Sequence, residues 1–309
     1  MKKRLLQSIT LLFFASTVFI GCTKNNDEPM VEIEVESAEH SDDQTNIAVE
    51  NDELANEYNN VVNNFSAFNG RESFGFFSPC DATITVDSTN TQRRITITYN
   101  GKVCNPYRTR KGVVVLTMPL MNKWKDAGSG ISVEIKNLTI TYLLRNKSMV
   151  INGTHSIKNV SGGLVRPVLN LGTIIHDIEG NMQIAFNSGT GRKWQIAKRR
   201  TFSFSNGLVI TTTGKATVDG VTNVSEWGSN RFGNSFITAI TQPMVIKQDC
   251  NFRLVSGQVT HSKLRSTITA TFGLDSNGVA VNCPQGSFYC KITFAGSNGT
   301  TKTKIFPYN

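Results

Sequence analysis

Residues 83–104 read TITVDSTNTQRRITITYNGKVC, and this stretch decides the fold class. In its second half, Ile95, Ile97 and Tyr99 alternate with threonines. Because successive side chains of a strand point to opposite faces, this alternation predicts a half-buried antiparallel strand. The Asn-Gly pair that follows is typical of a tight turn between strands. The stretch therefore predicts antiparallel β-structure.

The same pattern continues to the end of the chain. Alternating runs are separated by turn pairs such as Asn152-Gly153, Asn206-Gly207 and Asn298-Gly299. Such spacing predicts an all-β fold of about fifteen antiparallel strands with almost no helix after residue 80. A large sandwich, a barrel-like sheet and two tandem sheets all remain open.

The N-terminus has the composition of an export signal. Lys2, Lys3 and Arg4 precede an apolar run that ends at Gly21-Cys22. The run is short for a membrane span, so we expect residues 1–21 to be a cleaved signal peptide. Residues 19–22, Phe-Ile-Gly-Cys, resemble a lipobox, apart from Phe19 where leucine or valine is usual. Cys22 is therefore expected to carry the diacylglyceryl and palmitate chains of a lipoprotein. The alternative is a retained signal anchor.

An acidic segment follows the predicted anchor. Residues 23–57 contain twelve acidic residues against one lysine. Low hydrophobicity and charge of one sign predict a disordered, lipidated linker over 22–45. Apolar residues at three- and four-residue steps then predict a leader helix over 46–70. The acidic polar face of that helix disfavours a position on an anionic membrane surface.

Five cysteines remain after Cys22. Cys80 opens a pair of predicted strands that closes at Cys104, and Cys250 opens another pair that closes at Cys283. This repeat, with halves near 80–160 and 200–300 of a body over 71–309, predicts the disulfides Cys80–Cys104 and Cys250–Cys283 in an oxidising compartment. For Cys290, a buried thiol, pairing with Cys250 and a reactive role all remain open. The cysteine spacing does not predict a zinc site.

Two longer stretches carry a resemblance to a known family. They are TITVDSTNTQRRITITYNGKVCNPYRTRKGVVVLT (83–117) and VIKQDCNFRLVSGQVTHSKLRSTITATFG (245–273). They resemble outer-membrane lipoproteins of Bacteroidota that combine a lipobox, an acidic leader helix and a β-rich body. The family has no assigned activity, so the resemblance implies a fold and a cellular location. The chain departs from the pattern at 273–290, where it has an extra cysteine and a longer turn.

A second short motif bears on the cellular location. Residues 24–28, KNNDE, resemble the signals that send lipoproteins of Bacteroidota to the cell surface. The expected location is therefore the outer membrane, lipid-anchored and facing the cell surface, with the periplasmic face as the alternative.

The sequence contains no recognisable catalytic motif. Asp177 and Glu179 lie two apart, on one face of a predicted strand, and are the nearest approach to a glycosidase acid pair. A solvated strand face is the simpler interpretation. The three tryptophans, Trp124, Trp194 and Trp227, are expected in the core rather than on a carbohydrate platform. We therefore expect no enzyme activity, no cofactor and no metal.

Charge is the most informative remaining feature. After residue 57 the chain carries a formal charge of about +17. Such a surface attracts polyanions, so an anionic glycan or lipopolysaccharide is the expected ligand, while the address disfavours nucleic acid. The candidate anion-binding residues are Arg108, Arg110, Lys111, Lys198, Arg199 and Arg200. The alternatives are a scaffold or accessory subunit docked on an outer-membrane protein, and a glycan-active enzyme.

Overall fold

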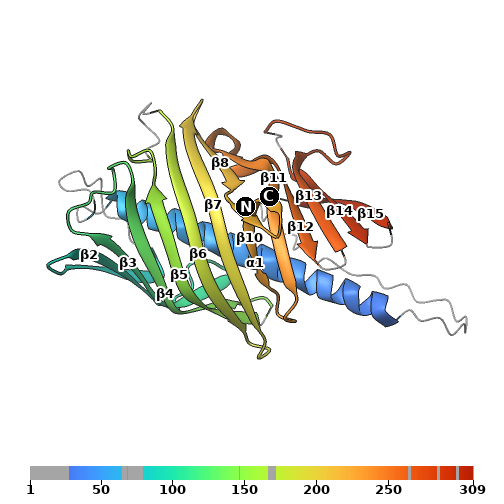
Figure 1. The fold of residues 1–309 in the computed structure, drawn as a ribbon, viewed down its shortest axis with the longest axis horizontal. Coiled ribbons are helices and arrows are strands. Elements are labelled where there is room, and N and C mark those ends of the chain that lie inside the picture. The colour runs from blue at the N-terminus through green and yellow to red at the C-terminus, as the bar shows by residue number, and fades with distance from the viewer. Residues whose placement is uncertain are drawn as a thin grey trace, which may run out of the picture.

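The computed structural model describes residues 28–64, 68, 79–145, 147–165, 172–263, 266–283, 286–296 and 299–308. The predicted signal peptide and Cys22 lie outside these residues. Across the described part the chain forms one long helix followed by strands, which confirms the predicted all-β body (Figure 1).

The elements follow one another with little irregular structure between them. Helix α1 spans Glu28–Asn64, and a short 3₁₀ helix, η1, spans Gln248–Cys250. The strands are β1 (Ala82–Ser88), β2 (Gln92–Asn100), β3 (Arg108–Pro119), β4 (Ser129–Tyr142), β5 (Lys147–Asn159), β6 (Ile174–Phe186), β7 (Gly191–Phe204), β8 (Leu208–Gly214), β9 (Ala216–Val218), β10 (Val221–Ser229), β11 (Ser235–Lys247), β12 (Arg253–Lys263), β13 (Ser266–Leu274), β14 (Phe288–Gly296) and β15 (Thr301–Tyr308).

All strands belong to one antiparallel sheet, which resolves the choice that the sequence left open. The order is β1 to β7, then β10 to β15, and β8 and β9 lie off this path. The first half of β7 pairs with β10 and its second half with β8, and β11 pairs with the same two strands. These four strands form a small closed ring of pairings. The end of β8 lies very close to β10, and this contact requires glycine at position 214. A Cβ on Gly214 would lie 1.9 Å from the carbonyl oxygen of Asn223.

Helix α1 runs across the strands along one face of the sheet (Figure 1). Its side chains Ile47, Leu54, Tyr58 and Val61 are at most 1% exposed and belong to one cluster with the buried side chains of the strands. Because an antiparallel sheet of this size exposes a wide apolar face, it must cover that face with another element. The helix therefore belongs to the same hydrophobic core as the strands.

The helix begins earlier than the sequence predicted. It includes Glu28, within the segment expected to be a disordered linker over 22–45, and is described as far as Asn64; the first residues of that linker and the predicted helix end at 70 lie outside the described residues. The predicted disorder rested on mutual repulsion of acids, but the body supplies the opposite charges. Asp42 lies 2.8 Å from Arg145, and Asp43 lies 2.5 Å from Arg231. Among the described residues, no helix is long and apolar enough to cross a bilayer.

Both predicted disulfides are present. The Cα atoms are 5.9 Å apart in Cys80–Cys104 and 5.3 Å apart in Cys250–Cys283. The first bridge encloses β1 and β2, and the second encloses β12 and β13, as the repeated cysteine pattern predicted. Cys290 is a buried, unpaired thiol, and burial raises its pKa. Burial and a raised pKa both suppress thiolate chemistry, which favours the structural interpretation of Cys290.

Candidate functional site

One stripe of α1 carries short side chains. Gln44, Ala48, Asp52 and Asn56 follow one another at four-residue steps and therefore share one face of the helix. This face lies opposite β8 and β10 to β13, whereas the large apolar side chains of α1 face elsewhere in the sheet. Because no side chain of the stripe is larger than glutamine, the helix leaves space against these strands.

The space is an apolar groove of about 510 Å³. This volume lies within the usual range of small-molecule sites, roughly 300–1,000 Å³. Its apolar lining comes from four strands, β8, β11, β12 and β13, and from the corner before β12: Ile210, Ile240, Met244, Ile246, Phe252, Leu254, Val259 and Phe272. Most of these side chains are only half-buried. A continuous half-buried apolar surface of this kind is characteristic of binding sites.

A strained corner holds one wall of the groove. Asn251 and Phe252, after η1, have φ angles of +59° and +55°. The left-handed conformation is uncommon for phenylalanine, and it leaves the Phe252 side chain 53% exposed at the groove. The preceding residue, Cys250, belongs to the second disulfide. The covalent bridge thus anchors the chain where the strained corner begins.

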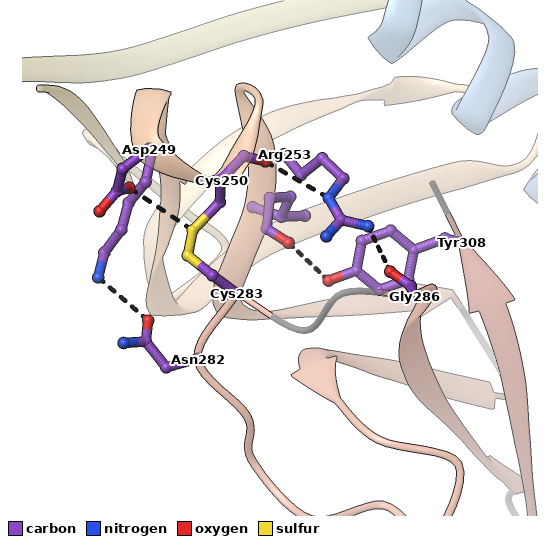
Figure 2. The surroundings of a disulfide bond; sticks show 9 residues. Asp249, Cys250, Arg253, Asn282, Cys283, Gly286 and Tyr308 are labelled. Carbon is purple, nitrogen blue, oxygen red and sulfur yellow. Dashed lines mark hydrogen bonds between the residues drawn. A yellow bond between two sulfur atoms is a disulfide. The ribbon is translucent and has the colours of Figure 1, made fainter.

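The disulfide has a network of contacts around it (Figure 2). Arg253 donates a hydrogen bond from Nη1 to the carbonyl oxygen of Gly286 at 2.7 Å. Tyr308 of the last strand donates from its hydroxyl to the carbonyl oxygen of Leu254 at 2.6 Å. These contacts attach the turn after β13 and the end of β15 to the strand that lines the groove. They favour a groove that is preformed rather than assembled on binding.

Charged side chains form the wall of the groove on β7. Because side chains alternate along this strand, Lys198 and Arg200 both face the helix. Lys198 lies 2.6 Å from Glu226, and Arg200 lies 2.6 Å from Asp52. Burial lowers the pKa of Lys198, but Glu226 and Asp52 more than offset this, so its pKa is raised and the ammonium stays charged. The groove therefore contains one buried ion pair, Lys198 with Glu226, and one half-exposed pair, Arg200 with Asp52, beside its apolar lining.

The six candidate anion-binding residues do not form an exposed patch. Arg108, Arg110, Lys198 and Arg200 are each at most 8% exposed. Arg108 pairs with Glu50 at 2.6 Å, and Arg110 pairs with Glu57 and Asp81, both at 2.7 Å. For these four residues the prediction of an anion site is corrected, because each is buried against a carboxylate of the protein: the helix supplies one for Arg108, Arg110 and Arg200, and Glu226 of β10 supplies that of Lys198.

The other two candidates remain at the surface. Lys111 is exposed, on the opposite face of β3 from its buried neighbours. Arg199 is half-exposed and makes a bidentate pair with Asp177, at 2.8 and 2.9 Å. Two residues on separate strands are too few for a contiguous polyanion site.

The candidate acid pair has partners that account for it. Asp177 and Glu179 share Lys215, at 3.0 and 2.9 Å, and Arg199 lowers the pKa of Asp177. A catalytic acid needs a raised pKa, so the direction of this shift does not favour a glycosidase. Trp124 and Trp194 are at most 1% exposed, in the core. Among the described residues, the one cluster with metal-ligand spacing is Asp249 with Cys250 and Cys283, whose sulfurs form the disulfide.

The groove was not predictable from any single motif of the sequence. Its lining residues are ordinary strand and helix residues, and they come from seven separate elements. Two signals were present. Short side chains recur at four-residue steps from Gln44 to Asn56, and the strands opposite carry half-buried rather than strictly alternating apolar residues.

Comparison of the chain with models of protein families, with curated proteins and with solved structures finds no match. The resemblance to lipoproteins of Bacteroidota, the lipid anchor and the address therefore stay predictions. The function has to be argued from the groove.

Proposed function

We propose that this chain is a non-catalytic lipoprotein of the outer membrane, anchored through Cys22, whose β body binds the hydrocarbon part of a small molecule in the apolar groove. The observation that carries the binding role is the groove itself, with a volume of about 510 Å³ and eight apolar side chains in its wall. Transfer of apolar surface from water into such a site is favourable at about 25 cal/mol per Å².

Two observations favour this function over the alternatives considered from the sequence. Five of the six candidate cations are already paired with carboxylates, and the six do not form one exposed patch, which disfavours an extended anionic glycan as the ligand. One edge strand of the sheet, β15, presents exposed Lys302 and Lys304 and contains Pro307. Lysine and proline at an edge oppose pairing with another strand, which disfavours edge-to-edge docking on a partner protein.

Binding is tested with an uncharged fluorescent probe, 1-N-phenylnaphthylamine, whose emission rises in apolar surroundings. The protein is the chain from residue 22 with Cys22→Ser, which keeps every described residue and carries no lipid. We expect saturable binding of one probe per chain. Ala48→Phe should abolish it, because the new ring occupies the groove from the helix side.

Met121→Phe is the matched control, because Met121 is 89% exposed and does not line the groove. It should bind the probe as the parent chain does. Equal binding by Ala48→Phe and the parent, or fluorescence that does not saturate, would exclude the groove as the binding site.

The anchor is tested in cells of a bacterium that lipidates exported proteins. The full chain is expected to incorporate an alkyne-labelled palmitate and to fractionate with the outer membrane. Cys22→Ala should lose the label, because the thiol that accepts the diacylglyceryl group is gone. Retention of label in Cys22→Ala, or its absence from the parent chain, would contradict the lipid anchor.

A further inference from the structure

Arg200, one of the two cations that line the groove, has a donor without a partner. Its Nη2 lies 2.6 Å from Asp52, and its Nη1 makes a long contact of 3.3 Å to Asn56. The residue is only 7% exposed, and its Nε is buried without a hydrogen-bond partner. A buried donor without a partner costs free energy, about 1–3 kcal/mol or more for a charged group. The guanidinium is therefore in a position to gain from an acceptor.

The space beside Arg200 decides what that acceptor is. Arg200 borders two cavities, and one of them, next to Trp124 and His176, has a volume of only about 10 Å³. That cavity has room for at most one water molecule. The other is the apolar groove. Any acceptor larger than water that reaches Arg200 therefore comes from the groove.

The second cation, Lys198, is held in an ion pair with Glu226 and is not available to a ligand. Its partner Glu226 has a side chain only 5% exposed, and Glu226 also accepts a hydrogen bond from Trp194 at 3.2 Å. Release of Glu226 from Lys198 would leave a buried carboxylate without its cation, which is strongly unfavourable. Lys198 and Glu226 thus remain a pair when the groove is occupied.

The partner of Arg200 is held less strongly. The side chain of Asp52 is 46% exposed, on the helix face that borders the groove. A carboxylate at that exposure can turn to solvent and be hydrated, so an anionic ligand can take its place on Arg200 at small cost. The result is a charge-assisted hydrogen bond inside an apolar site, which is stronger than the same bond in water.

Resting on the proposed function, we propose that the groove binds a single-chain amphiphile whose anionic oxygen head lies against Arg200, with its hydrocarbon chain along the apolar strands. A carboxylate and a phosphate monoester share this chemistry. Both present oxygens that can accept the planar donors of arginine, and both can carry one long chain.

The experiment is displacement of bound 1-N-phenylnaphthylamine from the same chain at pH 7.5. The competitors are laurate, dodecyl phosphate and 1-dodecanol, which share a chain length and differ in the head. Laurate or dodecyl phosphate should displace the probe at a concentration about tenfold lower than dodecanol, as one charge-assisted hydrogen bond allows. The stronger of the two anions identifies the head.

Two variants change the preference in opposite directions. Arg200→Gln should lose the preference for the anionic heads, so that laurate, dodecyl phosphate and dodecanol displace the probe from this variant at similar concentrations. Asp52→Asn removes the competing carboxylate, so it should increase the preference for laurate and dodecyl phosphate over dodecanol, with the three competitors compared on the same variant. Asp52→Asn also keeps Arg200 in place, so its outcome does not depend on whether Arg200→Gln folds.

The experiment distinguishes failure of the anionic-head inference from failure of the proposed function. If dodecanol competes as well as both anions and Asp52→Asn changes nothing, the anionic head is excluded while the apolar groove stands. If the probe itself does not bind the parent chain, the proposed function fails, and the inference fails with it.

Discussion

Replacement of Arg110 by methionine is expected to lower the free energy of unfolding by about 3–5 kcal/mol, because it leaves buried carboxylates without their cation. Arg110 holds Asp81 and Glu57 at 2.7 Å and lies 4.4 Å from the centre of the Tyr99 ring. All of these side chains are at most 9% exposed. Urea unfolding followed by tryptophan fluorescence measures the loss.

Lys111→Met is the matched control. It is the next residue, carries the same charge, and is exposed on the opposite face of β3. Its effect should stay within about 0.5 kcal/mol. Similar losses for the two variants would mean that the pairing of Arg110 with the helix contributes little to the fold.

The loss in Arg110→Met should depend on pH. Burial raises the pKa of Glu57 above its ordinary value of 4.5, and Arg110 opposes the rise. Without Arg110 the pKa of Glu57 in the folded state rises further, while the unfolded state keeps the ordinary value. An acid with a higher pKa in the folded state loses stability as the pH rises from the unfolded value through the folded one. The deficit relative to the parent chain should therefore be smaller near pH 4.5 than at pH 8.

The second large effect is expected for the helix core. Leu54→Ala should lower the free energy of unfolding by about 2–5 kcal/mol, since Leu54 is 1% exposed and its removal leaves a cavity. Thermal or urea unfolding reports the change. The control is Val49→Ala on the same helix, whose side chain is 51% exposed and whose effect should be within about 0.5 kcal/mol.

This comparison tests the role of α1 directly. If α1 were a spacer between the anchor and the body, Leu54→Ala would behave like Val49→Ala. A large difference between the two would place α1 in the same cooperative unit as the sheet, as their common cluster of buried side chains implies.

Local patterns in the sequence were sufficient for the strands and the disulfides. Alternation at Ile95, Ile97 and Tyr99 depends only on the two-residue period of a strand, and these residues are at most 2% exposed in β2. The cysteine pairs enclose two neighbouring strands each, so their pairing needed only the order of elements. The arrangement of the strands in a single sheet with a closed ring depends on pairings of β8 with both β7 and β11.

The error about the charges has a simple physical origin. The acidic residues of 23–57 and the basic residues of the body were considered separately, as a solvated linker and a basic surface. Glu57 and Arg110 are 53 positions apart, and Asp52 and Arg200 are 148 apart. A pattern within one segment cannot show that two such segments neutralise each other. The complementary signs of the two segments were the available signal.

By itself, the sequence determined the antiparallel strand content, the two disulfides and the apolar face of α1, because each depends on residues close along the chain or on the order of elements. Only the tertiary structure decided that the acidic residues from Asp42 to Glu57 lie on a helix packed on the sheet, that four of the candidate cations are buried, and that the short side chains of Gln44, Ala48, Asp52 and Asn56 face an apolar groove. These features depend on contacts between distant segments, and the free energy of such contacts is set by burial and by partner, which no local pattern contains.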